Sequence, residues 1–168
     1  QFRFNTVVID AGHGGKDPGT IWYHRVEKHL ALDVAKRVET GLRAKGIKTV
    51  MIRRNDTFVE LDQRARLANK VPNSIFVSVH FNADGKDFGK NGAEMHYYGP
   101  KGLYLGQRLD AAFDKSVKLG CAKLVRRNSL VVLRETKAPA VLVECGYLTH
   151  RTNSWLCCLS SHRQAVAN

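Results

Sequence analysis

Apolar residues recur along this chain in two different periods. Short runs rich in β-branched and aromatic residues predict strands, and apolar positions repeating about every four residues predict helices between them. The predicted strands span residues 6–10, 48–53, 74–80, 93–98, 130–133 and 140–144, with the strand at 93–98 nearer an edge of the sheet. The predicted helices span residues 26–45, 61–70 and 102–119, followed by a weakly patterned helical tail from residue 153.

The alternation of these elements predicts a fold class. Strands that alternate with helices are typical of α/β proteins, so we expect a mainly parallel, twisted sheet with helices on both faces. The chain of 168 residues is long enough for a substantial core and contains no repeat, low-complexity segment or linker. We therefore expect one domain over residues 1–168. No apolar run approaches the roughly 18 residues of a membrane span, so none is expected.

The net charge narrows the choice of partners only a little. There are 27 Lys and Arg residues against 15 Asp and Glu residues, a formal charge of +12. Such an excess favours polyanions, including nucleic acid, anionic lipid and acidic wall polymers, but it also fits a basic surface without a specific partner. Since no DNA-binding motif and no basic helix with an aromatic platform is present, no specific nucleic acid is expected.

The four cysteines add no predicted site. Cys121, Cys145, Cys157 and Cys158 include no CxxC pair, so a thiolate metal site is not expected. A core of this size does not need disulfides for stability. The redox state of the cysteines stays open.

Polar residues collect where the predicted strands end. His13 follows the first strand, His80 ends the third, Glu144 ends the last, and Glu27 lies in the first turn of the first helix. Sites in open α/β sheets form outside the carboxyl ends of the strands, so we expect these side chains to meet. Two imidazoles and one carboxylate are a ligand set of hydrolytic zinc sites, and a second carboxylate can act as general base.

Four short motifs carry a family resemblance. Residues 8–15 read VIDAGHGG with DPG at 17–19, Glu27 precedes Lys28, residues 78–83 read SVHFNA, and residues 143–148 read VECGYL. In this order they resemble the motifs of the zinc-dependent N-acetylmuramoyl-L-alanine amidases, the Amidase_3 family, from about residue 6 to residue 150. The family more often has Ser and Phe at the positions of Cys145 and Tyr147.

The resemblance implies a role for each motif residue. His13, Glu27 and His80 would bind one zinc ion per chain, and Glu144 would be the catalytic carboxylate. The bond cut would be the amide that joins the lactyl group of N-acetylmuramic acid to L-alanine in peptidoglycan. We accordingly expect an amidase catalytic domain that acts as a monomer in the cell envelope, periplasmic or secreted, with peptidoglycan as substrate and anionic wall polymers as further partners.

Several residues keep two interpretations. Asp10 fits either a buried structural carboxylate or the acceptor for a ligand histidine. Arg134 fits either a group that holds a substrate carboxylate or a surface arginine. Glu94, on an alternating strand, is expected to face solvent. The loop at 12–15 follows a strand and precedes a helix, but it matches neither the dinucleotide fingerprint nor the P-loop.

Two rival functions belong to the same fold. A degenerate binding module would lack a ligand or the base, whereas all four groups are present here. Another zinc amide hydrolase, such as a carboxypeptidase acting elsewhere on the stem peptide, would have the same groups. Only the reaction product separates this second rival from an amidase.

Overall fold

Six strands form one sheet in the order β4-β1-β5-β8-β6-β7. The computed structural model describes residues 3–117, 119 and 123–168. Neighbouring strands are parallel except β6 and β8, which are antiparallel. The strands are β1 (Thr6–Ala11), β4 (Lys48–Met51), β5 (Ser74–Asn82), β6 (Glu94–Tyr97), β7 (Lys123–Arg126) and β8 (Ala140–Tyr147). The predicted mainly parallel sheet is confirmed.

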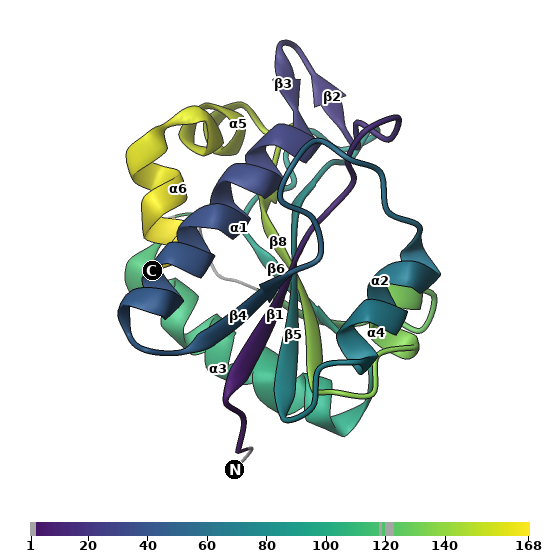
Figure 1. The fold of residues 1–168 in the computed structure, drawn as a ribbon. Helices are drawn as coiled ribbons and strands as arrows, with labels where there is room; N and C mark the ends of the chain where they lie inside the picture. Colours follow the sequence, from purple (N-terminus) through teal and green to yellow (C-terminus); the bar gives the residue numbers. More distant parts are fainter. Residues whose placement is uncertain (1–2, 118, 120–122) are drawn as a thin grey trace.

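Helices cover both faces of this sheet, as predicted. Figure 1 shows α1, α3, α5 and α6 on one side and α2 and α4 on the other. The helices are α1 (Glu27–Ala44), α2 (Leu61–Asn69), α3 (Gly99–Ser116), α4 (Val131–Arg134), α5 (Arg151–Cys158) and α6 (Ser160–Ala167). None of the described helices is long and apolar enough to cross a membrane.

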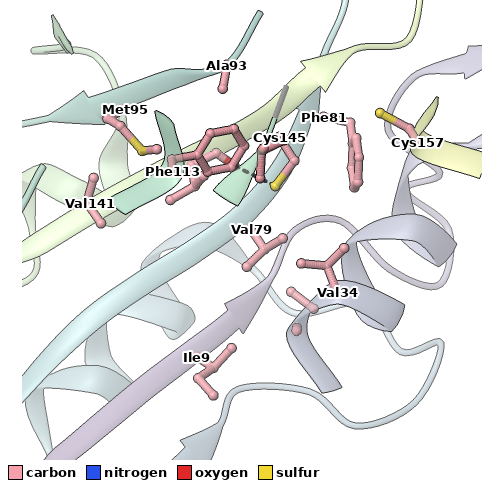
Figure 2. Close-up of a cluster of buried hydrophobic side chains, with 14 of the residues drawn as sticks. Ile9, Val34, Val79, Phe81, Ala93, Met95, Phe113, Val141, Cys145 and Cys157 are labelled. Carbon is pink, nitrogen blue, oxygen red and sulfur yellow. Dashed lines mark hydrogen bonds between the residues drawn. The ribbon is translucent and has the colours of Figure 1, made fainter. Parts of the chain in front are cut away.

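Alternate residues of the strands divide the core into two layers. Ile9, Val79 and Val141 belong to the larger cluster, into which α1 and α3 contribute Val34 and Phe113 (Figure 2). The residues between them in each strand form a smaller cluster with α2 and α4. Because side chains alternate between faces with a period of two, a one-residue shift in the register of a strand would move its residues from one cluster to the other.

The first helix ends where its sequence predicts. Gly46 has φ of 73°, and its N–H donates to the carbonyl oxygen of Arg43. The N–H of Ile47 donates to the carbonyl oxygen of Leu42. These two bonds form the Schellman arrangement that glycine favours after a helix, because glycine adopts positive φ without steric cost.

The strand predicted at residues 130–133 is wrong, because these residues begin the short helix α4. Val132 and Leu133 are buried in this helical turn, which ends at Arg134. The neighbouring strand β7 and the hairpin of β2 (Ile21–Trp22) and β3 (Arg25–Val26) were not predicted. Strands of two residues are too short to show a period, and β7 is mostly exposed, without alternation of apolar and polar residues.

The described cysteines Cys145, Cys157 and Cys158 are free thiols. Cys121 lies outside the described residues. Burial raises the pKa of the Cys145 and Cys157 thiols, so both stay protonated near neutral pH. These two thiols pack as small apolar groups in the larger cluster, as Figure 2 shows.

A buried arginine joins α2 to the sheet. The guanidinium of Arg64, which is 2% exposed, donates to Asp10 Oδ1 at 2.8 Å and to the carbonyl oxygens of Ala11 at 2.8 Å and His13 at 2.7 Å. Ser78 donates to the other carboxylate oxygen of Asp10 at 2.8 Å. The buried charge is therefore paired and hydrogen-bonded, as burial of a charge requires.

We predict that Arg64→Met destabilises the fold by about 3–5 kcal/mol, because it leaves the buried Asp10 carboxylate without its charged partner and removes the Arg64 donor to the His13 carbonyl oxygen. Urea unfolding followed by circular dichroism measures the change. Arg66→Met is the matched control, since Arg66 lies on the exposed side of the same helix, where it pairs with Asp62. Equal stabilities of the two variants would contradict the prediction.

Candidate active site

The strand register places three polar residues in one row across the sheet. His80 of β5 lies opposite Glu144 of β8, which lies opposite Glu94 of β6. All three side chains lie on one face of the sheet, because residues opposite each other on neighbouring strands share a face. The helices α2 and α4 cover the other end of this face. The row lies towards the carboxyl end of β5, where the sequence predicted a site.

The loop after β1 brings His13 to this row. His13 has φ of 59°, a left-handed conformation that is uncommon for any residue except glycine. The backbone of the loop is held by two arginines: Arg64 binds the His13 carbonyl oxygen, and Arg53 donates to the Ala11 and Gly12 carbonyl oxygens at 2.8 and 2.7 Å. Strained backbone of this kind persists only where surrounding contacts determine it.

Three ligand atoms meet at this point. His13 Nε2 lies 2.9 Å from Glu27 Oε1, His80 Nδ1 lies 3.1 Å from the same oxygen, and the two nitrogens are 3.2 Å apart. Glu27 is held there from two sides, since its Oε1 accepts from the Phe81 N–H and its Oε2 accepts from the Thr20 N–H. The structure thus brings together the three residues that were predicted to meet.

The short contacts of His13 require a positive charge. His13 Nδ1 lies 2.8 Å from Asp17 Oδ2, a distance at which the imidazole N–H donates to the carboxylate. His13 Nε2 lies 2.9 Å from Glu27 Oε1, and this separation is stable with either a proton on Nε2 or a metal ion bound by both atoms.

A tetrahedral metal ion fits this geometry. Tetrahedral ligands at the usual zinc distances of about 2.0–2.2 Å lie about 3.3–3.6 Å from one another, a few tenths of an ångström more than the three separations observed. His13, Glu27 and His80 are also the group of possible metal ligands found among the described residues. Two imidazoles and a carboxylate suit zinc and leave one position of the tetrahedron open.

The ionisation of the cluster agrees with this arrangement. Burial opposes the charged form of Glu27, yet the hydrogen bonds from His13 and His80 hold its pKa well below the usual range. Burial alone would lower the pKa of His13, but Glu27 and Asp17 raise it. Carboxylates on both sides of the His13 ring therefore attract a cation to the cluster.

Glu144 has a different environment from Glu27. Its Oε2 is buried and has no hydrogen-bond partner among the described residues. Burial raises its pKa to about 7, with a further contribution from the nearby Glu27 and Glu94 carboxylates. Near neutral pH this carboxyl can therefore either take up or release a proton, as a general acid–base requires.

Glu94 does not face solvent, so that prediction is wrong. Its carboxylate is buried and accepts from the Tyr147 hydroxyl at 2.7 Å, and its other oxygen lies 2.6 Å from His96 Nε2. A bulge places Tyr147 on this face: the register shifts by one residue after Glu144, and Gly146 has φ of 143°. Bulges that redirect a side chain are frequent beside active sites.

Asp10 and Arg134, the two residues with open interpretations, contact groups other than the three candidate metal ligands. Asp10 binds Arg64 and Ser78, and Asp17 is the acceptor on His13. Arg134 is in α4, where it donates to the Glu135 side chain and the Asn128 carbonyl oxygen. The contacts of Asp10 are those of a structural carboxylate.

Sequence reasoning missed three residues of this site. Asp17 stands four residues after His13 in the glycine-rich loop, and an acid so near a candidate ligand is a signal that was available. Arg53 and Arg64 bind loop carbonyls from positions 41 to 53 residues away in sequence. No local pattern marks such long-range partners.

Comparison with known proteins identifies the family. The family model described as N-acetylmuramoyl-L-alanine amidase matches residues 7–168. This chain belongs to that family. The amidase LytC of Bacillus subtilis is 34% identical over 164 residues, which cover 96% of this chain and 32% of LytC. This chain spans about a third to a half of the length of the curated relatives it matches.

Solved amidase structures share the whole fold. An N-acetylmuramoyl-L-alanine amidase from Clostridium difficile 630 superposes with a TM-score of 0.92 at 33% identity, over 98% of this chain and 91% of that chain. The catalytic domain of CwlV from Bacillus (Paenibacillus) polymyxa var. colistinus superposes with a TM-score of 0.91 at 34% identity, over 98% and 92%. The α/β fold of this chain is therefore that of amidase catalytic domains.

We predict that Gly12→Ala destabilises the protein by about 1–3 kcal/mol, because an added methyl group must displace a packed ring. A Cβ on Gly12 would lie 2.3 Å from Cε1 of His80. Urea unfolding measures the effect. In the control, Gly41→Ala, the added Cβ meets nothing within 4 Å and improves helix propensity, so stability should rise slightly. A Gly12→Ala variant as stable as the wild type would exclude the close contact.

Proposed function

We propose that residues 1–168 form the catalytic domain of a zinc-dependent amidase that hydrolyses the bond between N-acetylmuramic acid and L-alanine in peptidoglycan. One observation carries this function: three ligand atoms of His13, Glu27 and His80 lie about 3 Å apart, and His80 lies opposite Glu144, whose buried Oε2 has no hydrogen-bond partner among the described residues. Membership of the amidase family supports the choice of bond.

Each residue of the cluster contributes a separate part of the chemistry. His13, Glu27 and His80 would hold the zinc ion, with Asp17 fixing the orientation of the His13 ring through Nδ1. When bound, zinc would polarise the scissile carbonyl group and lower the pKa of a water molecule. Glu144 takes a proton from the attacking water and delivers it to the nitrogen of the leaving L-alanine.

The environment of Glu144 suits both proton transfers. A carboxyl with a pKa of about 7 is deprotonated often enough to accept the proton of water and acidic enough to return it. Its Oε2 has no internal hydrogen-bond partner among the described residues, so this oxygen is available to a water or an amine. Glu27 is unsuited to this role because it ionises at low pH and both of its oxygens have partners.

The place of action follows from the substrate. We propose a location in the cell envelope, periplasmic or secreted, because peptidoglycan lies there. The charge of +12 supports binding to anionic wall polymers in addition to the substrate. The function does not require a second copy of the chain, since all four groups come from one protomer, and we propose a monomer.

We predict that the protein binds one zinc ion per chain and that a chelator abolishes hydrolysis until zinc is restored. His80→Ala removes one of three ligands, so zinc content after dialysis should fall well below one per chain. Elemental analysis by mass spectrometry measures it. His24→Ala is the control, because His24 is exposed and lies in the neighbouring hairpin. Full zinc content in His80→Ala would remove His80 from the ligand set.

We predict that digestion of purified peptidoglycan releases free stem peptides with an amino-terminal L-alanine, detected by mass spectrometry. Glu144→Gln should bind zinc and fold normally but lower kcat by at least a hundredfold, because the amide cannot accept a proton. Glu135→Gln, an exposed carboxylate, is the control. Release of D-alanine alone would indicate a carboxypeptidase, and loss of zinc from Glu144→Gln would make Glu144 a ligand.

A further inference from the structure

A polar cavity of about 270 Å³ lies beside the row of His80, Glu144 and Glu94. Glu94 and Tyr147 form part of its wall, and Asn82 lines it two residues after His80. Because Glu94 lines the cavity and lies opposite Glu144, the cavity lies next to the candidate active site on the side of β6 and β7.

Three cations and two carboxylates line this cavity. Lys90 is paired with Asp84 at 2.5 Å, and both oxygens of Glu94 have partners in Tyr147 and His96. Lys123 and Arg127 are the other two cations of the cavity. In the described part of the chain, Lys123 has no ion pair, and the one ion pair of Arg127 is a long contact of 4.0 Å with Glu94 Oε2.

The two free cations reach the cavity from opposite ends of β7. Lys123 begins the strand opposite Glu94, and Arg127 follows the strand, with its guanidinium extending back towards Glu94. Residues 123, 125 and 127 face the same side of the sheet because strand side chains alternate. A small anion between the two side chains would contact an ammonium and a guanidinium, and the guanidinium can bind a carboxylate with two parallel hydrogen bonds.

The distance from Glu144 indicates which part of a substrate would reach these cations. Glu94 is one strand from Glu144 and Lys123 is two strands away, so the cations lie roughly 5–10 Å from the catalytic carboxyl. An extended peptide advances at most about 3.6 Å per residue. The second residue on the peptide side of the cut bond therefore reaches the cavity.

We propose that Lys123 and Arg127 bind a carboxylate on the second residue of the stem peptide, and that this contact selects acidic over amidated peptides. The proposal rests on the proposed amidase function and adds a specificity site to it. Glu94 keeps Arg127 beside the cavity, and Tyr147 and His96 already partner both oxygens of the Glu94 carboxylate.

The test compares two small substrates: N-acetylmuramoyl-L-alanyl-D-glutamate and the same compound with the α-carboxylate converted to an amide. The zinc-loaded wild type should cleave the acid with a kcat/KM roughly 10- to 100-fold higher, the range expected for a hydrogen bond to a charged group. Arg127→Gln should bring this ratio close to one, mainly through KM for the acid, because the contact is made before and during the reaction. Lys123→Met should lower the ratio less.

Arg126→Gln is the matched control. It removes the same charge from the same exposed strand, but Arg126 faces the opposite side of the sheet and does not line the cavity. This variant should keep the wild-type ratio. A wild type without preference for the acid, or an Arg127→Gln variant that keeps the preference, would overturn the inference.

Calorimetric binding to Glu144→Gln separates this inference from the proposed function. This variant keeps the cavity, so it should bind the acid at least tenfold more tightly than the amide. If the wild type cleaves neither compound, the amidase proposal fails, and the binding ratio still decides the cavity proposal. Equal affinities would overturn the cavity proposal even if both compounds are cleaved.

Discussion

The candidate site depends on the hydrogen bonds that the backbone carbonyl oxygens of the loop after β1 accept. This loop leaves the sheet within three residues and turns through a positive φ at His13, so the carbonyl oxygens of Ala11, Gly12 and His13 cannot join a strand ladder. Arg53 and Arg64 supply the missing donors from inside the protein. Since buried carbonyl groups need hydrogen-bond donors, these two arginines determine the position of His13.

The same constraint connects stability with chemistry. Arg64 also pairs with Asp10, whose other oxygen accepts from Ser78 on the neighbouring strand. The pair is buried beneath the loop, so the position of the His13 ring depends on the packing of α2 against β1. An imidazole held in this way loses little entropy when it binds a metal ion, because its rotamer is already fixed.

The two sides of the site attract ions of opposite charge. On one side, His13, Glu27 and His80 place two imidazoles and one carboxylate around one point, and Asp17 adds a second carboxylate at the far nitrogen of the His13 ring, so this side attracts a cation. On the other side, Lys123 and Arg127 border a cavity that suits an anion. Glu144 and Glu94 lie between the two sides, in one row of the sheet. From the loop after β1 to β7, the charged groups therefore change from a set that attracts a cation to a set that attracts an anion.

The amino-acid sequence by itself determined the strand–helix alternation, most element positions and the four polar residues that end or follow strands or begin the first helix, because these depend on local periodicity and on short motifs. It did not show that residues 130–133 turn into a helix or that Glu94 is buried, because these features depend on partners far away in sequence or on the opposite strand. The contact of Asp17 with His13 spans only four residues, but the folded loop decides its geometry. Above all, the bulge at Gly146 moves Tyr147 to the face of the active site. A one-residue shift in register reverses which face a side chain occupies, and only the assembled sheet decides that register.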